Sequence, residues 1–247
     1  MSPSGTAPLS TFINYLCRIK LLGAYCPVLL TAVIILLSAS SCSDRSGQVT
    51  SALDAADSLM MAQPQAALDT LNCLDSTAVR KMGSRDKAFY TLLLTEAEYK
   101  CYLPVAKDTA IFEAVKHYRR RGPEDRLARA LTMQGAVLYE RGDADGAMTA
   151  YKEAEPIIEK EGDLEQLGLI NTRIGALYKS SFINDSAAIA RYRKALECFE
   201  EAGLPERTMY AHSSIARMLM VGSINSIFYF LHKAAEPFNC LEQDNLA

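Results

Sequence analysis

Apolar and small residues recur along much of the chain at the three- and four-residue intervals of an amphipathic helix. The pattern is clearest in residues 119–154, where Gly142 and Asp143 separate two such runs. The first run consists of Leu131, Gly135 and Leu138. The second run consists of Ala147, Tyr151 and Ala154. Because the glycine–aspartate pair favours a turn, this stretch predicts a helix, a short turn and a second helix.

This helix–turn–helix unit occurs three times with a period of about forty residues. The leading glycines are 40 and 41 residues apart and are Gly122, Gly162 and Gly203. A second set of small residues keeps the same spacing and consists of Gly135, Gly175 and Ala216. A lone hairpin cannot bury all of its apolar surface, so we expect the three units to stack on one another.

Helical periodicity continues upstream of the three units. Residues 49–62 and 64–74 form one predicted helix pair, and residues 85–101 and 109–121 form another. Residues 75–84 are predicted to be a connecting loop. Together with the three repeats, the sequence predicts about five helix pairs and an all-α fold.

The unit that starts at Ala128 resembles a tetratricopeptide repeat (TPR). It has small Gly135 at the eighth place, and its other matches are Ala147, Tyr151 and Ala154. The second unit matches through Ile174, Gly175, Tyr178, Ala188, Tyr192 and Ala195, and the third through Ile215, Ala216 and Ala234. The sequence departs from the family in its longer period and in Pro156 and Pro237, which come earlier than the usual closing proline.

The resemblance implies a right-handed superhelical stack of antiparallel helix hairpins over residues 49–236, followed by a C-terminal tail at 237–247. In such arrays the first helix of each unit lines a concave groove that binds a protein or peptide. Carried over by position, the partner-binding residues are Arg129, Tyr139, Lys179, Tyr210 and Arg217. Tyrosine and arginine are common in binding hot spots, although solvated or packing roles for these five remain open.

Residues 1–41 resemble a bacterial lipoprotein signal peptide. Arg18 and Lys20 precede an uncharged apolar run at 21–37, and small residues follow it directly before Cys42. Ala39 stands where the family usually has leucine. The resemblance implies cleavage before Cys42, lipidation of that cysteine, and a linker at residues 42–48.

An uncleaved anchor helix is the alternative, because the 17 apolar residues are close to the minimum that spans a bilayer. In both cases the two basic residues stay on the cytoplasmic side, so the chain after residue 41 is expected to be extracytoplasmic. Without residues 1–41, which hold two basic and no acidic side chains, the chain has 24 basic and 29 acidic side chains. This net charge of −5 disfavours nucleic acid as a partner.

No motif in the sequence indicates catalysis, a metal or a cofactor. The histidines are His117, His212 and His232, and none has a second ligand at helical spacing. The cysteines after Cys42 are Cys73, Cys101, Cys198 and Cys240. The first three lie in predicted helices, so we expect them to be small buried packing residues. Asp143 fits the turn of the repeat rather than a calcium loop.

These features predict a non-enzymatic protein of the cell envelope, anchored to a membrane by lipid, whose concave face recruits a protein. A sensor or ligand-binding module of an envelope signalling or nutrient-uptake system is the alternative. The last unit lacks an evident polar cap, so self-association through the C-terminal end is a further possibility.

Overall fold

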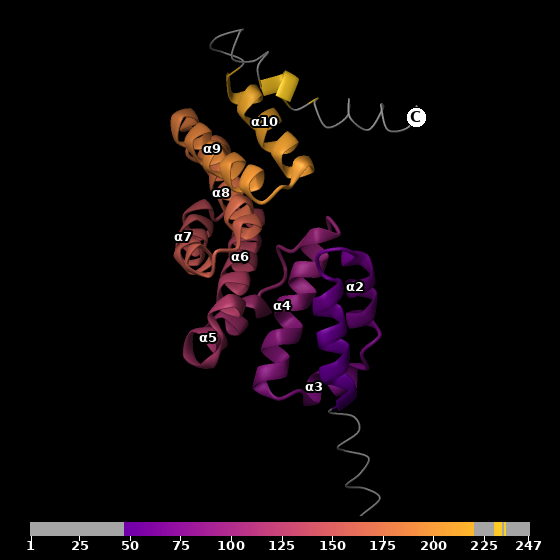
Figure 1. Ribbon diagram of the computed structural model, residues 1–247. Helices are drawn as coiled ribbons and strands as arrows, with labels where there is room; N and C mark the ends of the chain where they lie inside the picture. Colours follow the sequence, from indigo (N-terminus) through magenta and orange to yellow (C-terminus); the bar gives the residue numbers. More distant parts are fainter. Residues whose placement is uncertain (1–46, 220–229, 234, 236–247) are drawn as a thin grey trace, which may run out of the picture. The chain divides into compact units, whose positions relative to one another are not determined.

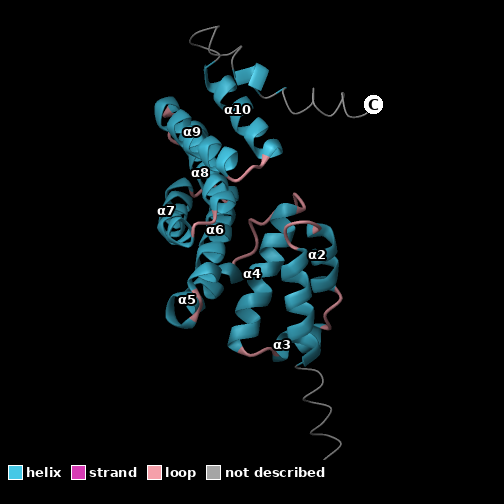
Figure 2. Cartoon of the chain, viewed as in Figure 1, coloured by secondary structure: helices cyan, strands magenta, loops and turns pink. Residues whose placement is uncertain are grey.

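The computed structural model of the chain describes residues 47–219, 230–233 and 235, and their regular secondary structure is entirely helical (Figure 2). Backbone contacts divide the chain into two units, residues 1–52 and 53–247. The described part of the first unit, residues 47–52, is helical. The predicted leader, Cys42, Cys240 and the C-terminal tail lie outside the described residues. None of the described helices is long and apolar enough to cross a membrane.

The second unit begins with helical residues 53–59 and continues as a series of helices joined by short turns (Figure 1). Its helices are α2 (Pro64–Asn72), α3 (Ser76–Lys81), α4 (Ser84–Lys100), α5 (Ala110–Arg121), α6 (Glu124–Glu140), α7 (Ala144–Glu161), α8 (Leu164–Ser180), α9 (Asp185–Glu201) and α10 (Pro205–Leu219). The second helix of the third repeat, which the sequence predicts to contain Ala234, falls mostly on residues that are not described.

Consecutive helices pack as hairpins, and each hairpin packs on the next. The hairpins are α4 with α5, α6 with α7, and α8 with α9. Successive hairpins meet where α5 packs on α6, α7 on α8, and α9 on α10. The predicted all-α architecture of stacked helix hairpins is therefore confirmed.

Two of the repeated small residues, Gly135 and Gly175, lie where the two helices of a hairpin touch. A methyl group added to Gly135 in α6 would overlap the ring of Tyr151 in α7. In the next hairpin, a Cβ atom on Gly175 would lie 2.9 Å from Cε1 of Tyr192. Both tyrosines are buried, and Ala216 is 1% exposed. In the α6–α7 and α8–α9 hairpins the period of the sequence therefore reflects the same contact between a glycine and a tyrosine ring.

The hairpins begin and end at residues suited to helix termini. Asp143 accepts a hydrogen bond from the backbone N–H of Gly146, and Asp163 accepts one from Gln166. Asn184 caps α9 in the same way through Ala187. Gly162 and Gly203 have φ angles of 73° and 66°, a left-handed conformation that glycine adopts without steric cost.

Two local expectations were wrong. The segment 75–84, predicted to be a loop, contains the short helix α3. Cys73 is exposed and Cys101 is half-buried, because each lies at the cap position after its helix; only Cys198 is buried as expected. All three are free thiols. In agreement with its early position in the repeat, Pro156 lies inside α7, which continues for five more residues.

Candidate functional site

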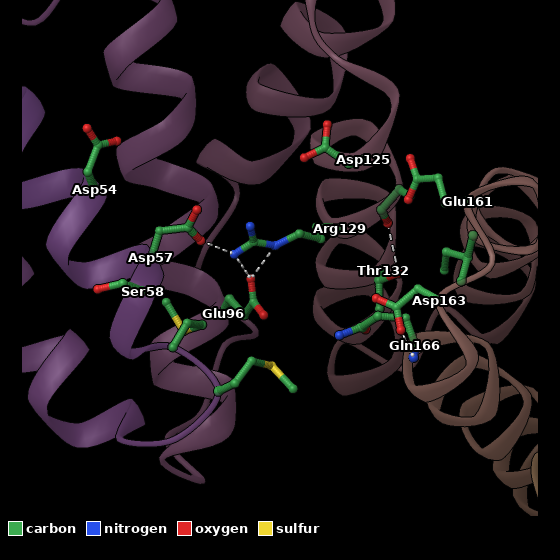
Figure 3. A pocket seen from close by; sticks show the side chains of 14 residues that line it. Asp54, Asp57, Ser58, Glu96, Asp125, Arg129, Thr132, Glu161, Asp163 and Gln166 are labelled. Atoms are coloured by element: carbon green, nitrogen blue, oxygen red, sulfur yellow. Dashed lines mark hydrogen bonds and ion pairs between the residues drawn. The ribbon is translucent and has the colours of Figure 1, made fainter. Parts of the chain in front are cut away.

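A cavity of about 550 Å³ in the second unit has carboxylates as six of its fourteen lining residues (Figure 3). Helical residues 53–59, α4 and α6 contribute to its wall, together with the end of α7, the turn after it and the start of α8. Its acidic residues are Asp54, Asp57, Glu96, Asp125, Glu161 and Asp163. Arg129 in α6 is the single cation among the lining residues. The cavity is therefore formed largely by first helices of successive hairpins and is strongly acidic.

Arg129 reaches across the cavity and joins two helices of the opposite wall (Figure 3). Its Nη2 lies 2.8 Å from Oδ1 of Asp57 and 2.8 Å from Oε2 of Glu96, and its Nε donates to the same Glu96 oxygen at 3.1 Å. Burial disfavours the charged guanidinium, but the two carboxylates outweigh this cost and raise the pKa of Arg129. The Arg129 charge is thus neutralised within the protein.

Lys100 adds a second cation next to this ion-pair network. Its Nζ lies 3.6 Å from Oε1 of Glu96 and 2.9 Å from the sulfur of Met61. Desolvation lowers the pKa of Lys100; Glu96 opposes this effect, while Arg129 adds to it. Asp57 and Glu96 are therefore both committed to cations of the protein itself.

The remaining carboxylates of the cavity differ in whether they have a hydrogen-bond partner within the protein. Asp163 caps α8 through the backbone N–H of Gln166, at 3.0 Å. The side chains of Asp54, Asp125 and Glu161 are exposed and make no hydrogen bond or ion pair with any residue in the described part of the chain. Burial, followed by the charges of Asp125 and Asp163, raises the pKa of Glu161. Mutual repulsion at this rim would be relieved by a positive charge from outside.

Of the five partner-binding residues predicted from the sequence, only Arg129 lines this cavity. The other four are exposed and lie on α6, α8 and α10. Tyr139 is 43% exposed, and its hydroxyl lies 3.4 Å from Oγ of Ser180 in the next hairpin. Tyr210 is 67% exposed, and Nη2 of Arg217 lies 3.3 Å from Oγ of Ser214. Ser180 directly follows Lys179 in α8, so the structure places Tyr139 and Lys179, two of the predicted residues, near each other.

Sequence reasoning missed the acidic residues of the cavity. Asp57 and Glu96 precede the clear repeats, so no periodic marker singled them out. Asp125 and Asp163 offered a signal, because both lie close to the start of a first helix in adjacent units. Acidic residues there also stabilise helix N-termini, which made a purely local role sufficient to explain them.

No three metal-ligating side chains come together in the part of the chain that the structure describes. His117 is half-buried beside Tyr118, and His232 is exposed. His212 is buried, with Nε2 lying 3.7 Å from Oε1 of Glu200. These histidines come from three separate helical segments and do not converge on the acidic cavity.

No family model matches the sequence, and no curated protein matches it. Several solved structures match the fold. BtubC (BKLC) from P. vanneervenii is 16% identical, with a TM-score of 0.51 over 78% of this chain and 72% of that chain. A signal transduction ATPase with a tetratricopeptide repeat sensor from Pyrococcus horikoshii gives a TM-score of 0.60 at 16% identity, covering 79% of this chain but 30% of that chain.

A putative kinesin light chain with nearly identical TPR-like repeats, from Podosopora anserina, gives a TM-score of 0.54 at 11% identity. That match covers 76% of this chain and 93% of the other. At these identities the likeness shows the fold alone. The fold is TPR-like, in agreement with the resemblance of the repeat units.

Proposed function

We propose that this protein is an interaction scaffold whose acidic cavity binds a basic segment of a partner protein. The observation that carries the proposal is the charge of the cavity: six carboxylates surround one arginine, and that arginine is already paired. TPR-like folds present a surface of first helices on which peptide segments can lie. A function in binding rather than catalysis fits this surface.

The partner chemistry follows from the three carboxylates whose side chains form no ion pair within the described residues. Asp125 and Glu161 lie at the exposed rim, and Asp54 lies on the other wall (Figure 3). A lysine or arginine placed between them would gain charge-assisted hydrogen bonds. It would also relieve the repulsion from Asp125 and Asp163 that adds to burial in raising the pKa of Glu161. Complementary charge of this kind contributes specificity and speeds association.

The exposed residues of the later hairpins extend this surface in the proposal. Tyr139 and Tyr210 offer aromatic contact area, and Lys179 and Arg217 offer positive charge. The basic segment of a partner would then bind in the acidic cavity, while apolar and acidic side chains next to that segment would contact these tyrosines and cations. In this arrangement Arg129 has an organising role, because its ion pairs hold Asp57 and Glu96 in the wall.

The proposed location is the extracytoplasmic side of a bacterial membrane, with lipid attached to Cys42. The support is the order of features in the sequence: Arg18 and Lys20, the apolar run at 21–37, and small residues before the cysteine. A lipid anchor would hold the scaffold at the membrane, where its partner would be found.

Site-specific photocrosslinking in intact cells tests the proposed cavity. A photoreactive residue replaces Ser58, which is exposed and lines the cavity, in the full chain. We expect one protein adduct, and we expect the Asp125→Lys/Glu161→Lys double variant to reduce it at least tenfold because the basic segment would then be repelled.

The matched control is Glu197→Lys/Glu201→Lys. It makes the same change in net charge at two exposed positions of α9 that do not line the cavity. The adduct should persist in this variant. If the adduct decreased equally in both double variants, or remained unchanged in both, the acidic cavity would not be the binding site.

A further inference from the structure

A second cavity, of about 640 Å³, lies between α4 and α5 and has the opposite charge. Its floor contains small residues, among them Ala88 and Ala114, which are 6% and 1% exposed. The positively charged side chains around it are Lys87, Lys116, Arg120 and Arg121. Glu113 is the one carboxylate that lines it. A concave site with four cations is unexpected in a protein whose net charge is −3.

Most of this positive charge has no counterpart among the residues that the structure describes. Lys116 pairs with Glu113 at 3.6 Å. The side chains of Lys87, Arg120 and Arg121 make no hydrogen bond or ion pair with any residue that the structure describes. In contrast, the neighbouring Arg119 points elsewhere and forms a bidentate pair with Glu153 on α7. Three uncompensated cations therefore face one small cavity.

Local helix stability explains only part of this arrangement. Arg120 and Arg121 lie in the last turn of α5, where positive charge interacts favourably with the helix dipole. That effect does not explain Lys87, which lies on α4, or Lys116, which lies one turn earlier on α5. Lys116 and Arg120 are four residues apart and therefore share one face of the helix. The convergence of two helices on one cavity points to a ligand.

We infer that this cavity binds a phosphate group of a phosphorylated ligand. Arginine side chains match the oxygens of a phosphate in pairs, and lysine supplies a compact additional charge. Ser84, the first residue of α4, also lines the cavity, and no side chain caps this helix. Free backbone N–H groups at such an end favour an anion, which adds to the binding by the cations.

The site is independent of the proposed scaffold function, because no lining residue is shared between the two cavities. Phosphate could come from a soluble phosphorylated compound or from a lipid headgroup. Two soluble probes distinguish these sources: pyrophosphate, and glycerophosphoglycerol, the deacylated headgroup of phosphatidylglycerol. Calorimetric titration of the full chain in a non-ionic detergent measures both.

We expect saturable binding of one of the two probes, weakened at least tenfold in Arg120→Gln/Arg121→Gln and also weakened in Lys87→Gln. The charge-matched control is Arg141→Gln/Arg193→Gln, which removes two exposed arginines outside the cavity and should change the affinity less than twofold. Preference for pyrophosphate would identify a soluble ligand, and preference for the headgroup would identify a lipid.

Several results would overturn the inference. They are the absence of saturable binding by either probe, equal weakening in both double variants, and tighter binding of a glutamate-rich peptide than of either probe. Circular dichroism of each variant, compared with the native chain, separates loss of binding from loss of fold. If Arg120→Gln/Arg121→Gln fails to fold, the Lys87→Gln variant decides the matter, because Lys87 is exposed on α4.

Discussion

At the scale of single residues, the repeat depends on how closely two helices approach. Gly135 and Gly175 leave space that the rings of Tyr151 and Tyr192 fill. Both tyrosines are less than 10% exposed, and burial raises the pKa of Tyr151 and of Tyr192. Protein interiors are close-packed, so neither ring has room to move away from an added methyl group.

Gly135→Ala should therefore destabilise the protein despite the higher helix propensity of alanine. Overpacking typically costs 1–3 kcal/mol, and alanine returns up to about 1 kcal/mol in a helix. We expect a net loss of about 1–2 kcal/mol, and a smaller loss for Gly175→Ala, where the added atom would lie 2.9 Å from the ring. Urea denaturation followed by circular dichroism measures both.

Gly47→Ala is the control, because Gly47 is helical and nothing lies within 4 Å of its missing Cβ. This change should leave stability equal or slightly higher. Replacing Tyr151 with leucine in the Gly135→Ala background should recover part of the loss if the ring is the obstacle. Stability unchanged in Gly135→Ala would contradict the packing role given to the repeated glycine.

At the scale of helices, one polar cluster connects three neighbouring elements. Glu155 in α7 is 8% exposed; its Oε1 lies 2.5 Å from Nη1 of Arg191 in α9. The same arginine donates to Oδ1 of Asn171 in α8 at 2.9 Å. Although burial favours the neutral acid, hydrogen bonds from Lys152 and Arg191 keep the pKa of Glu155 below its usual value. The cluster thus ties adjacent hairpins together.

Arg191→Met should destabilise the protein by about 2 kcal/mol, because it leaves a nearly buried carboxylate with weaker partners. Arg119→Met breaks an ion pair whose side chains are 49% and 39% exposed, and such pairs contribute less than about 1 kcal/mol. Denaturant titration of both variants at neutral pH measures the contrast. Similar losses in the two would mean that burial does not strengthen the Glu155 cluster.

The pH dependence of the same variants gives a second measurement. Because folding lowers the pKa of Glu155 from 4.5, the unfolded chain binds the proton more readily. The contribution of Glu155 to the free energy of unfolding is complete above pH 4.5, its pKa in the unfolded chain. This contribution is lost as the pH falls through the lower pKa of the folded state. The stability difference between Arg191→Met and the native chain should therefore shrink in acid.

The predictable part of the fold was the part that repeats. The Gly135 and Gly175 period and the Gly142 turn fixed the hairpins of the middle region, since close packing and backbone sterics act locally. The short helix α3 was missed because residues 76–81 bury no side chain and so have no apolar period. Arg129 pairs with Asp57 and Glu96, which lie 72 and 33 positions earlier in the sequence. Helical periodicity relates residues only three or four positions apart, so it could not predict these ion pairs.

At the scale of the whole molecule, the second unit separates positive from negative charge. The helix α4 contributes to both cavities: Lys87 near its start lines the basic cavity, and Glu96 near its end lines the acidic one. Nine residues of α-helix correspond to about 13 Å, which exceeds the screening length of about 8 Å at physiological ionic strength. The two cavities should therefore bind their ligands with little electrostatic interference.

Attachment to a membrane would place both cavities at a surface, and Cys42 is the residue on which this depends. Cells that express the full chain and are fed an alkyne-bearing palmitate analogue should incorporate label into the native protein and none into Cys42→Ser. A single leading apolar run of 17 residues is barely long enough to anchor a chain without lipid. We therefore expect alkaline carbonate to extract at least several-fold more of the Cys42→Ser variant than of the native protein from membranes.

The Cys26→Ser variant controls for the loss of a thiol, because Cys26 is a cysteine within the apolar run. This variant should keep both the label and the attachment to the membrane. Unlabelled native protein that still resists extraction would instead identify residues 21–37 as an uncleaved anchor helix.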